Sequence, residues 1–179
     1  MAIPSSNGRA ATGAILALQA AGVAFTVHHF EHVSNNRGHG WVAATALELP
    51  PERVFKTLVV NLTVNLTGSA GSTGGQGIEQ VVAIVPVSGQ LSLRELAVAL
   101  GGKRAEMCSV AVAERVTGYV TGGISPFGQK KRLRTAIDDS CVLFETVFVS
   151  GGRRGLDIEL APDALVDLLS AVVAPIATS

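Results

Sequence analysis

The sequence predicts an α+β fold in a single domain that covers residues 1–179. Three observations lead to this fold class: short β-branched or alternating segments recur along the chain, helix patterns with capping residues lie between them, and Gly, Pro, Asn and Ser mark the turns. The 179 residues, 47% of them apolar, suffice for one substantial core. We therefore expect a mixed, barrel-like β-sheet of six or more strands, surrounded by four to five helices.

The first third of the chain predicts two helices and two strands. Residues 12–21 carry Ile and Leu among alanines and end at a glycine, which is the pattern of a helix with a C′ glycine. Residues 25–30 alternate as a strand does. Residues 41–49 form a short helical segment before the breaker pair Pro50-Pro51, and residues 54–62 predict the strongest strand because they are rich in β-branched side chains.

The middle of the chain begins with a turn-rich segment. Residues 63–77 are Gly, Ser, Thr and Asn-rich, which favours a hairpin excursion or flexible loop over an interdomain linker. The apolar run 81–87 then resumes the sheet. The capping box Ser92-Leu-Arg-Glu95 opens a helix, residues 105–107 predict a short strand, and a helix capped by a serine is expected over 109–118.

The last third predicts three strands and a final helix. Residues 131–137 and 146–150 are expected to be strands that flank a turn at 138–140, and a third strand follows at 156–160. Pro162 stands at the first position of an amphipathic helix, where its missing N–H is not needed.

Charge and cysteine content exclude several classes of protein. Fourteen cations balance fourteen anions, so no global field attracts the protein to nucleic acid or to an acidic membrane, and any polyanion must be held by a local patch. No run approaches the roughly 18 apolar residues that span a bilayer, so we expect no membrane association. Two cysteines without a disulfide or metal-site pattern fit a reducing cytoplasm.

The Gly118–Arg134 stretch, GYVTGGISPFGQKKRLR, is the strongest candidate for a binding site. Gly122 and Gly123 can adopt positive φ or let a ligand approach the backbone, and Pro126 fixes the far end of the loop while favouring an extended Ser125. Such a loop presents backbone N–H groups to an anionic ligand. On local sequence alone, a simple surface turn remains the alternative.

Lys56 stands at the centre of an apolar strand and shares a face with Val54 and Leu58. A lysine on such a face is partly desolvated or reaches into a cleft, where it can hold a phosphate, a carboxylate or a developing oxyanion. The alternative is an edge-strand lysine whose stem covers apolar surface.

The cation block after the loop predicts a phosphate contact. On a strand, Lys130, Arg132 and Arg134 fall on one face while Lys131 and Leu133 fall on the other. Three cations in a row repel each other unless an anion lies near, so we expect either the phosphate groups of a ligand or a solvated strand face.

A second Gly-rich segment carries cations and an acid. In Ser150–Gly155 a strand ends in glycines, followed by Arg153 and Arg154. Asp157 on the next strand is expected either to pair with those arginines or to polarise a group of the ligand.

No metal site or nucleophile stands out in the sequence. His28 and His29 point to opposite faces of a strand, and no second cluster of ligands accompanies them and His32, so we expect no metal. Ser125 lacks a nucleophile elbow and a nearby histidine, and the two cysteines are most simply packing residues.

Segments 54–60, 117–133 and 147–160 together resemble the YbaK/ProX family of aminoacyl-tRNA deacylases, with a close match to its YbaK branch of cysteinyl-tRNA(Pro) deacylases. The similarity spans nearly the whole chain. It implies a single editing domain related to the insertion domain of bacterial prolyl-tRNA synthetases, which hydrolyses the ester between a wrong amino acid and the tRNA 3′ end.

The resemblance implies roles for particular residues. The implied catalytic residues are Lys56, Gly122 and Asp157. The implied substrate-binding residues are Phe30, Gly123, Ile124, Ser125, Pro126, Ser150, Gly151 and Gly152. The cations expected to meet tRNA phosphates are Lys130, Lys131, Arg132, Arg134 and Arg153. The chain departs from the family at Phe30, where members often carry tyrosine, and at Arg134, where a proline is common. The segment GSAGSTGGQG at 68–77 also lengthens the hairpin before Val81.

The resemblance also implies a mechanism without cofactor or protein nucleophile, because the thiol of a cysteinyl substrate attacks its own ester. The sequence therefore predicts a trans-editing hydrolase for Cys-tRNA(Pro), and also for Cys-tRNA(Cys), with tRNA and a prolyl-tRNA synthetase as partners. Deacylation of alanyl-tRNA(Pro) and a non-catalytic tRNA- or synthetase-binding module remain as alternatives.

Overall fold

A computed structural model of the protein describes residues 10–31, 38–66 and 74–179. The segment 67–73, at the centre of the expected loop 63–77, lies outside the described residues. In the described part of the chain, no helix has the length and apolar character needed to cross a membrane.

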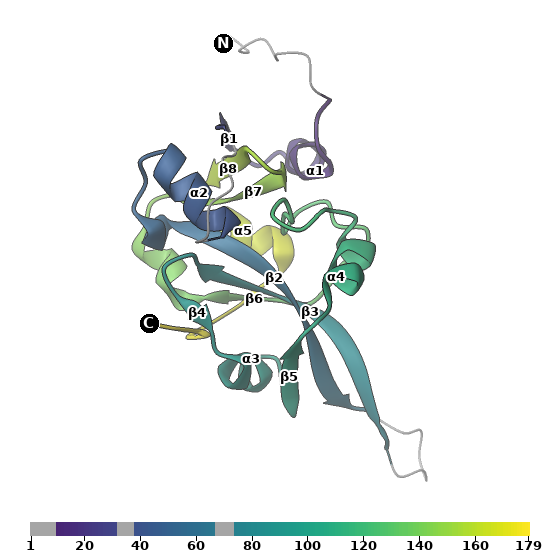
Figure 1. Ribbon diagram of the computed structural model, residues 1–179. Coiled ribbons are helices and arrows are strands. Elements are labelled where there is room, and N and C mark those ends of the chain that lie inside the picture. The colour runs from purple at the N-terminus through teal and green to yellow at the C-terminus, as the bar shows by residue number, and fades with distance from the viewer. Residues whose placement is uncertain (1–9, 32–37, 67–73) are drawn as a thin grey trace.

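An eight-stranded mixed sheet forms the centre of the molecule (Figure 1). Its strands in spatial order are β1 (Thr26–His29), β8 (Leu156–Leu160), β7 (Val147–Arg153), β2 (Val54–Asn65), β3 (Gln76–Pro86), β6 (Thr135–Asp138) and β9 (Val172–Ala174), with β5 (Arg104–Met107) paired to another part of β2. A second sheet pairs β4 (Gln90–Leu91) with β10 (Ala177–Thr178). The terminal strands β1 and β9 do not pair with each other, so the sheet is open.

Five α-helices and two 3₁₀ turns surround the sheet in the described residues. The α-helices are α1 (Gly13–Ala20), α2 (His39–Ala46), α3 (Leu93–Ala99), α4 (Val110–Thr117) and α5 (Pro162–Leu169), and the 3₁₀ turns are η1 (Pro51–Arg53) and η2 (Asp139–Leu143). Helix α1 contacts β7, α2 contacts β2, and α3 contacts β5 (Figure 1). The side chains of Ser92 and Ser109 cap α3 and α4 by accepting from Glu95 N and Val112 N.

Alternation along β2 divides the core between the two faces of the sheet. Phe55 packs into a cluster with α1 and α5, whereas Val60 and Leu62 pack into a cluster with α3. Because successive strand residues point to opposite faces, odd and even positions of β2 serve different parts of the core. Strand β2 thus contributes side chains to both parts of the core.

Strand β2 has two different neighbours along one of its edges. It pairs in parallel with β7 at Val54 and Phe55, and antiparallel with β5 from Val60 to Thr63. Between these ladders, residues 56–59 have no strand beside them on that edge, among the described parts of the chain. The opening lies beside the loop that follows α4 (Figure 1).

The fold confirms the expected α+β class, with its mixed sheet and five helices, but the sheet is not a closed barrel. The prediction of a strand over 131–137 is wrong for its first residues, because β6 begins only at Thr135. Lys130 N and Lys131 N instead donate to Thr117 O and Val116 O, at the end of α4. These bonds turn the cation block into an irregular segment. The short strands β4, β9 and β10 were not predicted.

Candidate functional site

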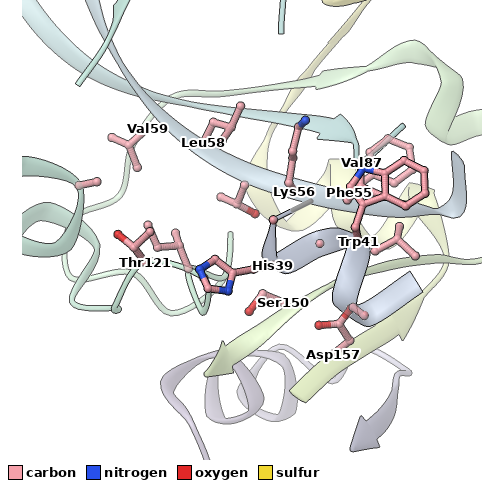
Figure 2. A pocket seen from close by; sticks show the side chains of 18 of the residues that line it. His39, Trp41, Phe55, Lys56, Leu58, Val59, Val87, Thr121, Ser150 and Asp157 are labelled. Atoms are coloured by element: carbon pink, nitrogen blue, oxygen red, sulfur yellow. The ribbon is translucent and has the colours of Figure 1, made fainter. Parts of the chain in front are cut away.

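A cavity of about 400 Å³ opens at the unpaired edge of β2 (Figure 2). Its walls come from β2, from α2, from the loop after α4 and from the β7–β8 hairpin. The sequence-predicted residues that line it are Phe30, Lys56, Gly122, Ile124, Ser150, Arg153 and Asp157. Segments far apart in the sequence therefore meet here, and the three motifs of the sequence contribute to one site.

Lys56 reaches the cavity from one face of β2. Its Nζ donates to the carbonyl oxygen of Gly89 at 2.7 Å, and burial lowers the pKa of the ammonium group. Figure 2 shows the side chain pointing away from His39 and Ser150. The cation is thus held by a backbone carbonyl, and contact with a ligand beside His39 and Ser150 would require it to leave Gly89 O.

Asp157 and Ser150 face each other across β7 and β8. Asp157 is only 6% exposed, and burial raises the pKa of its carboxyl group to about 7. Of the two alternatives for Asp157, the described structure does not show pairing with the neighbouring arginines. Arg153 donates to Ala10 O, and Arg154 donates twice to Thr121 O at 3.0 and 2.7 Å. Asp157 therefore lines the cavity with a carboxyl group whose charged form is disfavoured by burial.

Backbone geometry shapes the loop after α4. Gly122 has a φ of +87°, a conformation that L side chains rarely adopt, and Gly123 N donates to Val120 O. The side chain of Ser125 is fully buried and its Oγ accepts from Phe127 N. Gly122 and Ile124 therefore face the cavity, while Ser125 fixes the shape of the loop instead of lining it.

The remaining predicted binding residues lie behind the cavity wall. Gly151 and Gly152 pack so closely that an added Cβ would meet Leu156 and Tyr119 at 2.3 and 2.8 Å. Pro126 lines a separate, smaller cavity. Like Ser125, these residues support the site through the backbone, and their expected direct contact with a substrate stays a prediction.

The cation block lies outside the main cavity. Arg134 forms a bidentate ion pair with Glu79, at 2.9 and 2.8 Å, and also donates to Leu100 O. Arg132 donates to Ser170 Oγ at 3.3 Å. Because 130–134 is not a strand, the expectation that Lys130, Arg132 and Arg134 share one strand face is wrong. The side chains of Lys130 and Lys131 are exposed.

Several cavity residues were missed from the sequence. Thr57 shares a face of β2 with Phe55 and Val59, the face on which Ile124 packs. Its Oγ1 is buried and has no hydrogen-bond partner in the described structure. The sequence could have indicated Thr57, because it places a hydroxyl next to Lys56 in a buried strand and a buried hydroxyl normally has a hydrogen-bond partner.

The backbone of Thr57 also faces the opening. Val87 N donates to Val54 O, so the even-numbered residues of β2 form the backbone hydrogen bonds with β3. The odd-numbered residues therefore point their N–H and C=O groups to the opposite edge of β2, which faces β5 and β7. On that edge, Cys108 N donates a hydrogen bond to Val59 O. The peptide groups of Thr57 therefore lie at the open edge and are available to a ligand.

His39 was also missed, because it stands at the end of a polar segment and no motif surrounds it. It is the first residue of α2 and lines the cavity. The described residues contain no group of three or more His, Cys, Asp or Glu side chains placed to hold a metal ion.

Comparisons with known proteins agree with this geometry. The model of the aminoacyl-tRNA editing domain matches residues 41–168. EbsC of Enterococcus faecalis, assigned as a Cys-tRNA(Pro)/Cys-tRNA(Cys) deacylase, is 37% identical over 135 residues, which are 75% of this chain and 74% of that protein. The multifunctional Ser/Thr-tRNA deacylase ProXp-y of Escherichia coli is 39% identical over 72 residues, or 40% of this chain and 42% of that protein.

The fold has a close structural relative as well. A crystal structure described as a trans-editing enzyme for prolyl-tRNA synthetase has a TM-score of 0.74 at 20% identity, and the match covers 96% of this chain and 100% of that one. The match of the family model over residues 41–168 defines an editing domain. The chain belongs to the aminoacyl-tRNA editing domain family, which confirms the resemblance seen in the sequence and the expected class of enzyme, an aminoacyl-tRNA deacylase.

Proposed function

We propose that the protein acts in trans on Cys-tRNA(Pro), and on Cys-tRNA(Cys), and releases cysteine from the tRNA 3′ end. The observation that carries this proposal is the cavity at the open edge of β2, where Gly122 and Ile124 of the loop face Ser150 and Asp157. Its size of about 400 Å³ fits an aminoacyl group and part of the terminal nucleoside.

The cysteine thiol supplies the nucleophile in this mechanism. The sulfur attacks the ester carbonyl, the bond from that carbon to the ribose oxygen breaks, and the thiol proton goes to the departing ribose oxygen. The cyclic thioester then reacts with water to give free cysteine. The site contributes by holding thiol and carbonyl in near-attack geometry and by stabilising the oxyanion with backbone N–H groups at the loop and with Lys56.

The tRNA body is the proposed partner of the exposed cations. Lys130, Lys131 and Arg132 are exposed, whereas the guanidinium of Arg134 is already paired with Glu79. Arg153 lies at the cavity wall. A net charge of zero gives weak attraction to RNA, so we infer that prolyl-tRNA synthetase supplies part of the tRNA binding.

A deacylation assay on cysteinyl-, alanyl- and prolyl-tRNA(Pro) tests the proposal. Cysteine release is expected to exceed the background rate and to fall by about 10²-fold or more in Lys56→Ala, because a charge-stabilising donor is lost. Lys103→Ala, which removes an exposed lysine outside the cavity, is the matched control.

Other results would assign a different function. Release of alanine but not cysteine would make the protein an alanyl-tRNA(Pro) deacylase. Binding of tRNA with ester decay at the background rate would make it a non-catalytic module. Unchanged cysteine release in Lys56→Ala would remove Lys56 from the mechanism.

A further inference from the structure

The cavity extends around the free edge of β2. Five consecutive residues of the strand line it: Thr57 and the four that flank it, Phe55, Lys56, Leu58 and Val59 (Figure 2). Successive strand residues point to opposite faces of a sheet, so a pocket above one face would be lined by alternate residues only. A ligand in this cavity therefore meets the backbone edge of β2 as well as its side chains.

The free part of this edge is one hydrogen-bonding residue long. On one side of Thr57, Phe55 pairs with Val149 of β7. On the other side, Val59 O accepts from Cys108 N at 3.4 Å. Phe55 and Val59 are about 13 Å apart along the strand, and among the described residues no strand lies beside Thr57 on this edge. The gap thus offers one N–H and one C=O, the two groups that a single residue of an antiparallel neighbour would use.

The side chain of Thr57 offers a third polar group. Its Oγ1 is buried and has no hydrogen-bond partner in the described structure, although Thr57 lines the cavity. Ile124 packs with Val59 on the same face of β2, so apolar side chains surround this hydroxyl. Buried hydroxyl groups normally have a partner. A polar atom of a bound ligand would supply it.

We propose that Thr57 binds the aminoacyl group of the substrate as if that group were one residue of an antiparallel strand. The inference rests on the proposed function, because it concerns the same bound ester. The α-amino group of the substrate donates to Thr57 O, and the ester carbonyl oxygen accepts from Thr57 N–H. These are the two bonds that a pair of opposed residues exchanges in an antiparallel sheet.

This arrangement places the side chain of the substrate beside that of Thr57. Opposed residues of an antiparallel pair are about 5.5 Å apart at Cα and direct their side chains to the same face. The thiol of an L-cysteinyl group therefore lies next to Thr57 Oγ1, and its S–H can donate to that oxygen. A D-amino acid held by the same two bonds would direct its side chain to the opposite face of the sheet.

Thr57 is therefore a specificity-determining residue that recognises three features of the aminoacyl group. These features are a free α-amino group, the L configuration and a polar atom at the γ position of a small side chain. The N–H of Thr57 also fixes the ester carbonyl before the thiol attacks it.

Binding of stable analogues tests each feature without chemical turnover. The probes are 3′-amino-3′-deoxyadenosines that carry the acyl group through an amide: L-cysteinyl, D-cysteinyl, L-alanyl and 3-mercaptopropionyl, which lacks the α-amino group. Titrations of the full-length protein followed by amide NMR give the Kd values. The D-cysteinyl and 3-mercaptopropionyl probes are expected to bind about 10-fold more weakly than L-cysteinyl, and L-alanyl about 3-fold more weakly, because each loses a hydrogen bond.

Hydrogen exchange of the Thr57 amide reports the backbone contact directly. In the free protein this N–H lies at the open edge, and the L-cysteinyl probe is expected to slow its exchange by about 10-fold or more. The amide of Thr63, another odd-numbered residue of β2, is the internal reference, because Thr63 pairs with β5 and lies outside the cavity. Its exchange is expected to stay the same.

Thr57→Val separates the hydroxyl from the backbone groups. It removes Oγ1 and keeps N–H and C=O, so the preference for L-cysteinyl over L-alanyl is expected to disappear while the preference for L- over D-cysteinyl remains. Thr63→Val makes the same change outside the cavity and is expected to keep both preferences. Thermal unfolding shows whether both variants are folded.

The outcomes separate this inference from the proposed function. Equal affinity for the L- and D-cysteinyl probes, unchanged exchange of the Thr57 amide, or no binding of the L-cysteinyl probe would overturn the strand-like docking. A preference for L-cysteinyl over L-alanyl that persists in Thr57→Val would overturn the role of the hydroxyl. If the wild type binds the probes as expected but releases no cysteine from Cys-tRNA(Pro), the docking stands and the proposed function fails.

Discussion

Replacing Gly123 by alanine places a methyl group against the backbone of the β7–β8 hairpin. The added Cβ would lie 2.8 Å from Arg153 Cα, 3.0 Å from Arg153 C and 3.1 Å from Arg154 N. Ordinary contact begins at 3.4 Å, so the loop and the hairpin must separate by about 0.6 Å. No flexible side chain can absorb this movement, because all three atoms belong to the backbone.

Two losses are expected from this displacement. Overpacking of this kind lowers the free energy of unfolding by about 1–3 kcal/mol. For a domain of this size that corresponds to a decrease in Tm of about 2–12 °C. Because the loop faces Ser150 across the cavity, its displacement is also expected to reduce kcat/KM for Cys-tRNA(Pro) by up to about 10²-fold.

Calorimetry and single-turnover deacylation measure the two losses. Gly75→Ala is the matched control, since its Cβ would meet only Leu66 Cδ1 at 4.0 Å. A Gly123→Ala protein with the Tm and kcat/KM of Gly75→Ala would refute the reasoning, because the loop would then not depend on close packing against the hairpin.

Three further results are expected. Thr57→Val removes a buried hydroxyl that has no partner, so calorimetry of the ligand-free protein should show stabilisation by about 1 kcal/mol while KM rises. Burial raises the pKa of Asp157 from 3.8 to about 7, so the free energy of unfolding should fall as pH rises from about 4 to about 7. In urea titrations of Asp157→Asn this pH dependence should disappear, and a variant that keeps it would contradict the role of Asp157. Lys130→Ala should reduce the salt slope of tRNA binding by about 1, whereas Arg134→Ala should change it little because Glu79 already neutralises that guanidinium; equal slopes would contradict the difference.

Local patterns explain which parts of the fold could be predicted. Ser92 and Ser109 cap helices and Pro162 begins one, as expected, since caps depend on residues within one turn of each other. The strand expected from residue 131 failed because the backbone of Lys130 and Lys131 bonds to the end of α4, a contact that no local pattern encodes.

The sequence by itself determined the family and the fold class, and it predicted some of the residues that line the cavity. Lys56, the Gly122 loop and Asp157 were found because their turn chemistry and charge are properties of short segments. Only the tertiary structure decided that β7 and β5 leave part of β2 open between them and that His39 packs on Gly122. The reason is physical: strand pairing and side-chain packing join residues distant in the chain, and their geometry follows from the whole core.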